Sequence, residues 1–85
     1  MRSRQEMKDL LDNHHQWPEK YTFKFIVPAD QIDSVRGMFN DDPREERPSA
    51  NGKYVSLTVH KTMPSSDSVL DIYDTAAKIP GLIAL

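Results

Sequence analysis

Hydrophobic and polar residues alternate along two segments of the chain, which is the pattern of β-strands with one covered face. In residues 20–27 the apolar side carries Tyr21, Phe23, Phe25 and Val27, and the other side carries Lys20, Thr22, Lys24 and Ile26. In residues 53–62 the apolar side carries Val55, Leu57 and Val59, and the polar side carries Tyr54, Ser56, Thr58 and His60. Two long strands, each with one apolar face, are therefore predicted.

Three other segments show the three-to-four-residue spacing of amphipathic helices. The spacing predicts a helix over about 31–39 with Asp30 as its N-cap, and a second over about 67–78 that Ser65 or Ser66 caps. Residues 4–15 predict a marginal helix without a clear N-cap, which Pro18 ends. The core-facing stripes are Ile32, Val35 and Phe39, then Val69, Ile72, Tyr73, Ala76 and Ile79, and in the first segment Met7, Leu10 and Leu11.

Residues 47–62 predict a β-hairpin around Asn51-Gly52, the residue pair favoured in a type I′ turn. Pro48 has no N–H to donate, so the first hairpin strand belongs at a sheet edge. The sequence leaves open whether the loop has two residues or three, and a change of one residue would turn Arg47 to the opposite face. The charged residues 40–46 are predicted to form a solvated surface loop, and the apolar residues 82–85 a final edge strand.

The predicted order after the N-terminal segment is β-α-β-β-α-β. Right-handed crossovers then give an α+β, ferredoxin-like two-layer sandwich, with a four-stranded antiparallel sheet and both helices on one face. Residues 1–19 are interpreted as an N-terminal helical extension and residues 20–85 as a single domain. A chain of 85 residues is too short for two separate cores.

Composition narrows the classes of function. The net charge of −2 and the pI near 5.8 argue against a general affinity for nucleic acid or anionic membranes. The absence of Cys excludes disulfides, thiolate metal sites and a cysteine nucleophile, and it fits a reducing compartment. Because no apolar run approaches the length that spans a bilayer, we expect a cytoplasmic protein without membrane contact.

Three short motifs lie in and around the predicted hairpin: Arg47-Pro48-Ser49, Asn51-Gly52-Lys53-Tyr54 and Ser56-Leu57-Thr58-Val59. They resemble the signature of the YbeD-like family of small, uncharacterised bacterial proteins, and further similarities extend over roughly residues 10–85. The resemblance implies an ACT-like fold and a regulatory or interaction role without an established activity. Small-molecule-binding ACT domains usually have a glycine in the first strand-to-helix turn, whereas this chain has Pro28-Ala29-Asp30.

The sequence carries no assembled catalytic or metal-binding motif. It contains no G-x-S-x-G, no H-E-x-x-H and no glycine-rich phosphate loop. The adjacent His14 and His15 diverge on a helix and have no ligand-type partner four positions away on that helix, so they and His60 are interpreted as surface or docking residues. We therefore expect no enzymatic activity, no cofactor and no metal site.

The polar face of the sheet remains, and it is either an ordinary solvated face or a contact surface. The leading hypothesis is a regulatory or adaptor module that contacts an unidentified protein partner as a monomer or weak homodimer. The alternative is an ACT-type sensor of an amino acid or similar metabolite. An RNA-binding module comes third, because one exposed Tyr and one imidazole do not make a base-stacking platform. The residues expected to form the contact surface are Lys24, Arg47, Ser49, Tyr54, Ser56, Thr58 and His60.

Overall fold

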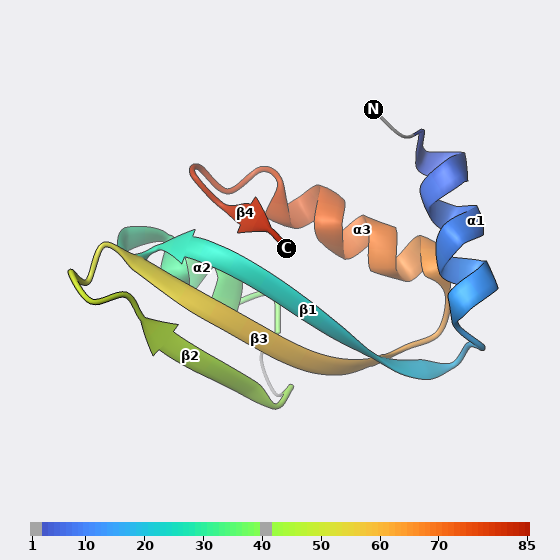
Figure 1. Cartoon of the computed structure of the whole chain (residues 1–85), viewed down its shortest axis with the longest axis horizontal. Coiled ribbons are helices and arrows are strands. Elements are labelled where there is room, and N and C mark those ends of the chain that lie inside the picture. The colour runs from blue at the N-terminus through green and yellow to red at the C-terminus, as the bar shows by residue number, and fades with distance from the viewer. Residues whose placement is uncertain (1–2, 40–41) are drawn as a thin grey trace.

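The computed structural model describes residues 3–39 and 42–85, and it contains the predicted order of strands and helices (Figure 1). None of the helices it describes is long and apolar enough to cross a membrane. In chain order the elements are α1 (Arg4–His14), β1 (Glu19–Pro28), the 3₁₀ turn η1 (Ala29–Gln31), α2 (Ile32–Arg36), β2 (Arg44–Pro48), β3 (Tyr54–Met63), α3 (Ser66–Ala76) and β4 (Ile83–Ala84).

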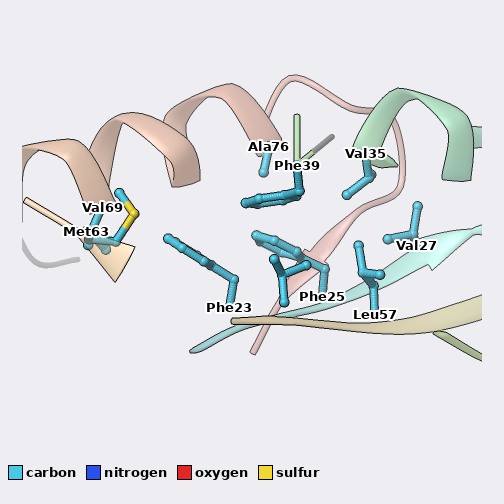
Figure 2. Packing of buried hydrophobic residues seen from close by; sticks show 10 residues of the cluster. Phe23, Phe25, Val27, Val35, Phe39, Leu57, Met63, Val69 and Ala76 are labelled. Carbon is cyan, nitrogen blue, oxygen red and sulfur yellow. The ribbon is translucent and has the colours of Figure 1, made fainter. Parts of the chain in front are cut away.

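The four strands form one antiparallel sheet in the order β2-β3-β1-β4. This order and the two crossovers confirm the α+β, ferredoxin-like class. Both α2 and α3 lie on the same side of the sheet, as the close view of the core shows (Figure 2). The predicted edge positions are also confirmed, since β2 and β4 are the outer strands and the central pair is β1 with β3.

The core lies between the sheet and these two helices, and it uses the apolar side of each predicted strand (Figure 2). Phe23 and Phe25 of β1 and Leu57 of β3 are completely buried, and Val35 and Phe39 cover them from the helical layer. The rings of Phe23 and Phe39 lie 5.6 Å apart and those of Phe25 and Phe39 6.2 Å apart, within the usual range for paired aromatic side chains. The period-two pattern in the sequence therefore identified the buried face correctly.

The first crossover helix is shorter than predicted. Asp30 lies inside the 3₁₀ turn and does not cap α2, whose first residue is Ile32. At the other end Met38 N–H bonds to Val35 O and Phe39 N–H to Arg36 O, so the last turn tightens to a three-residue repeat. This tightening ends the α-helix at Arg36 while the ring of Phe39 stays in the core.

Two predictions about the hairpin are wrong. Arg44, Glu45 and Glu46 belong to β2 rather than to a loop, because the pairing with β3 continues to Arg44↔Val59; Asn40 and Asp41 lie outside the described residues. The turn is not type I′, because Gly52 is its only residue with positive φ (+73°), whereas type I′ requires two. Instead Gly52 N–H bonds to Ser49 O, which closes a turn over Ser49, Ala50, Asn51 and Gly52. Residues 49–53 connect the two strands, and a loop of this length turns the chain without a positive φ at Asn51.

The N-terminal helix packs against α3 and is better capped than predicted. Ser3 is its N-cap, with Ser3 Oγ accepting a hydrogen bond of 3.2 Å from Glu6 N–H. Arg4 forms ion pairs with Asp71 and Asp74 of α3. α1 therefore borders the helical layer and leaves the opposite face of the sheet open (Figure 1).

A candidate contact surface on the open face of the sheet

The register of the strands decides which predicted residues share the open face. Arg47 pairs with Ser56 in the β2–β3 ladder, and Thr58 pairs with Lys24 in the β1–β3 ladder. Residues directly opposite in a ladder project to the same side of a sheet. The open face therefore carries six of the seven predicted residues: Lys24, Arg47, Tyr54, Ser56, Thr58 and His60. The alternative in which Arg47 faces the helices is excluded.

Ser49 has a different place, in the turn between β2 and β3. Its hydroxyl accepts a hydrogen bond from Tyr54 N–H (3.2 Å) and donates one to Asn51 Oδ1 (2.9 Å). Asn51 Oδ1 also accepts from Lys53 N–H at 3.1 Å. Ser49 therefore holds the turn that positions Tyr54 and is committed to that role.

The part of the open face between β2 and β3 forms a shallow polar hollow of about 490 Å³. Glu45 lies opposite Thr58, and Arg47 lies opposite Ser56, so a carboxylate and a guanidinium border two hydroxyls. Tyr54 stands at the turn end of the same face and is 45% exposed. The strands hold the backbones of Tyr54 and Arg47, so binding a partner would order only their side chains.

His60 is half-buried near the other end of the face. Its Nδ1 lies 3.1 Å from Thr22 Oγ1 on the neighbouring strand. The hydroxyl partner holds the imidazole ring in place on the open face. The arrangement fits a polar contact residue better than a general base.

The open face has an excess of positive charge although the chain is acidic. Lys20, Lys24 and Arg47 lie on it together with the single carboxylate Glu45. None of the three cationic side chains hydrogen-bonds or pairs with any other residue in the described ranges 3–39 and 42–85. On the opposite layer, α3 carries Asp67, Asp71 and Asp74 and no Lys or Arg, and Arg4 of α1 pairs with two of these carboxylates. The residues of α3 and those of the open face therefore differ in the sign of their charge.

The sequence reasoning missed an ion-pair cluster on the helix side of β2. Arg36 of α2 donates to both carboxylate oxygens of Glu46 and to Asp33, and Arg44 Nε lies 3.4 Å from Glu46. The hydrogen bonds from Arg36 hold the pKa of Glu46 below its usual value of 4.5. The alternation of Arg44 and Glu46 before the edge residue Pro48 was the signal available in the sequence. The cluster fastens β2 to α2 and so fixes the edge of the open face.

A second hollow, of about 360 Å³ and mostly apolar, lies between α1, α3 and the edge of β1. At its floor the hydroxyls of Tyr21 and Tyr73 are 3.1 Å apart, and burial raises the pKa of Tyr73. The side chains around it come from four elements, which no local pattern connects. They are Met7, Leu11, Tyr21, Leu70, Tyr73, Ala84 and Leu85.

Of the two histidines near the end of α1, His14 is exposed and His15 has structural partners. His15 Nδ1 lies 2.7 Å from Glu19 Oε1, and its ring stacks on Trp17 with centroids 5.1 Å apart. Asp12 accepts a hydrogen bond from the indole N–H of Trp17. Over the described part of the chain, no three His, Cys, Asp or Glu side chains gather as a metal site would require.

Comparison with known proteins identifies one family. The model of a family described as a protein of unknown function, DUF493, matches residues 12–85. This is the YbeD-like family that the motifs around the hairpin resemble, so that prediction is confirmed. No curated protein and no solved structure matches the chain.

Proposed function

The chain belongs to this family of small uncharacterised proteins, and from that premise we propose that it is a non-enzymatic regulatory or adaptor module that acts through protein contacts. The observation that carries the proposal is the open sheet face. Its exposed Tyr54 and unpaired Arg47 are of the residue types that dominate binding energy at interfaces. Tyr54 lies on the core strand β3, and Arg47 lies on β2, which pairs with β3 and is tied to α2 through Glu46, so a partner would meet a preformed surface.

The positive sign of the face defines the chemistry of the partner. A partner surface with Asp or Glu side chains opposite Lys24 and Arg47 would be attracted to this face and repelled by the acidic helical layer. Such complementarity selects the orientation of docking more than it adds to affinity. The module therefore presents one face to an acidic partner.

Affinity capture from lysate of the native host, followed by binding measurements with the purified candidate, tests this proposal. We expect an acidic partner that binds the wild-type protein and loses at least tenfold in affinity with R47E combined with Y54A. K78E is the matched control, because Lys78 is an exposed cationic residue beyond the end of α3. Equal binding by the double variant and the wild type would contradict the open-face proposal.

The alternative function is an ACT-type sensor of an amino acid or a related metabolite. The hollow on the open face favours it, because Glu45 and Arg47 present the two charges that would pair with an ammonium and a carboxylate. The turn from β1 into η1, Pro28-Ala29-Asp30, lacks the glycine usual in ligand-binding ACT domains, which favours the adaptor. Titration with single free amino acids distinguishes the two functions, since a saturable rise in melting temperature that R47E abolishes would support the sensor.

We also propose the cytoplasm of a bacterium as the setting, and a monomer or weak homodimer as the free state. The lack of cysteine fits a reducing compartment. Single-stranded RNA is not an expected ligand, because the acidic chain offers one exposed aromatic residue on the face where RNA-binding relatives of this architecture stack bases.

A further inference from the structure

The N-terminal half of β1 pairs with β3 on one side and has no strand partner on the other side, where β4 is too short to reach it. β1 spans ten residues, but β4 pairs only with Phe25 and Ile26. Ala29 N–H bonds to Lys53 O across the β3 side, whereas Lys24 O accepts from Leu85 N–H on the β4 side. In an antiparallel ladder the side to which the backbone groups point alternates from one residue to the next.

It follows that the backbone N–H and C=O groups of Lys20 and Thr22 point to the side of β4, beyond the place where β4 ends. No residue in the described ranges pairs with them in the sheet. Both residues are exposed. Two residues of β1 therefore offer four unpaired main-chain groups in strand geometry, which is the template for strand addition.

The apolar hollow lies beside this edge, on the helix side. Tyr21, which lies between the two open positions, forms its floor, and α1 and α3 form its walls with Met7, Leu11 and Leu70. Met7 remains 39% exposed, and Leu85, the residue after β4, is 69% exposed. A strand paired with Lys20 and Thr22 would direct every second side chain into this hollow.

The charges on the other side of the same edge are positive. Lys20 and Lys24 flank Thr22 on the open face, and neither pairs with another residue of the described chain. Side chains of an added strand that point away from the hollow would lie beside these two ammonium groups. Acidic residues at those positions would be attracted, and basic residues repelled.

We propose that this edge binds an extended segment of another protein in which apolar and acidic residues alternate. The apolar side chains enter the hollow between α1 and α3, the acidic side chains lie beside Lys20 and Lys24, and the backbone extends the sheet in line with β4. This site lies on the other side of the sheet's centre from Arg47. It shares Lys24 with the open-face surface, but it needs neither Arg47 nor Tyr54.

A second copy of this chain fits the edge poorly. Two copies related by a twofold axis would place Lys20 and Lys24 of one against the same residues of the other. The edge of β2 is also a poor competitor, because Pro48 lacks an N–H and the side chains of Arg44 and Glu46 are tied to α2 and each other.

The test is an NMR titration of the whole protein with the synthetic peptide acetyl-Glu-Val-Glu-Leu-Glu-Val-Glu-amide. We expect saturable binding below about 1 mM, amide shift changes at residues 20–23 and in α1, and slower hydrogen exchange of the Lys20 and Thr22 amides. A peptide with the same residues in non-alternating order should bind at least tenfold more weakly, and so should one with Lys in place of Glu.

Three variants locate the site. K20E should weaken binding at least fivefold, and M7E should weaken it by placing a carboxylate at the apolar hollow. T22P should abolish the exchange protection of the Lys20 amide, since it removes the outward N–H of residue 22. It keeps the backbone bonds between β1 and β3 but loses the contact between Thr22 and His60. If T22P fails to fold, K20E and M7E decide the question. K78E, a charge reversal at an exposed lysine beyond the end of α3, should bind the peptide as the wild type does.

Several results would overturn the inference. Shift changes confined to residues 44–48 would place the peptide on β2, and equal binding of the alternating and reordered peptides would remove the basis for strand addition. Concentration-dependent shifts at residues 20–23 without peptide would show that a second copy occupies the edge. If the peptide does not bind but a protein partner binds in a way that R47E weakens, only the open-face proposal is supported. If the peptide binds at the β1 edge and no partner depends on Arg47, only the strand-addition proposal is supported.

Discussion

The two faces of the central strands differ in what their side chains do. On the helix side Phe25 and Leu57 are completely buried, whereas on the open side Tyr54 is 45% exposed. Lys24 and Ser56, the residues just before Phe25 and Leu57, point to the open face, where Lys24 lies opposite Thr58 and Ser56 lies opposite Arg47. One strand of alternating residues thus supplies both the core and the candidate surface.

This difference means that stability and recognition should be separable by substitution. A side chain buried among rings loses contacts on every side when it is shortened, and a cavity remains. A side chain on the open face loses contacts with water and one or two neighbours. Substitutions on the helix side should therefore mainly lower stability, and substitutions on the open face should mainly lower binding. The turn and the edge of β2 should lie between these two extremes.

The largest expected effect is on the helix side. F25A should lower the free energy of unfolding by about 3–5 kcal/mol, a large part of the roughly 4–13 kcal/mol expected for a domain of this size. Urea denaturation measures it, with F25L as the control that retains most of the volume. A loss below about 1 kcal/mol would show that Phe25 is not a core residue.

A smaller effect is expected at the turn. G52V should cost about 1–3 kcal/mol, because Gly52 has a φ of +73° that a β-branched residue adopts only with strain. A Cβ at this position would meet no other atom within 4 Å, so the loss would come from backbone conformation alone. G52N is the control, since Asn tolerates positive φ better. Thermal melting compares the two, and equal midpoints for G52V and the wild type would mean that the turn and the register of β2 are misassigned.

The contribution of the Arg36–Glu46 pair at β2 to the free energy of unfolding should depend on pH. Because hydrogen bonds from Arg36 lower the pKa of Glu46, the unfolded chain binds a proton at this residue more readily than the folded chain. The contribution of Glu46 to stability is therefore complete above its usual pKa of 4.5 and is lost as the pH falls through the lower folded pKa. E46Q should be less stable than the wild type at pH 7, and the difference should shrink in strong acid. D33N, which keeps the Arg36–Glu46 pair, should change less, and a difference that is constant from pH 7 to pH 2 would contradict the ion pair.

The smallest effect on stability is expected on the open face. Y54A and R47E should each change the free energy of unfolding by less than about 0.5 kcal/mol, because both side chains are exposed and neither fills the core. Urea denaturation of these variants beside F25A makes the comparison direct. A loss above about 1.5 kcal/mol would show that the open face contributes to folding, and it would weaken any use of these variants as probes of binding.

The hairpin shows where sequence reasoning succeeds and where it stops. Pro48 placed β2 at an edge because a missing N–H is a local property of the residue. The direction of Arg47 stayed open, because it depends on how many residues close the loop between two strands. The pair Arg36–Glu46 was missed for the same reason, since two residues ten positions apart meet only when β2 has its register beside β3 and α2 has its length.

The sequence by itself determined the order of the elements, the buried face of β1 and β3, a serine cap for α3 at Ser65 or Ser66, and the edge position of the C-terminal strand. These features follow from local geometry, since alternation and helical spacing fix a side chain's direction within its own element. Only the tertiary structure decided that Arg47 shares a face with Lys24, that α1 docks on α3, and that an apolar hollow lies beside the unpaired half of β1. Each of these brings together elements that are distant in the chain, and their relative placement is set by loop closure and by packing of the whole core.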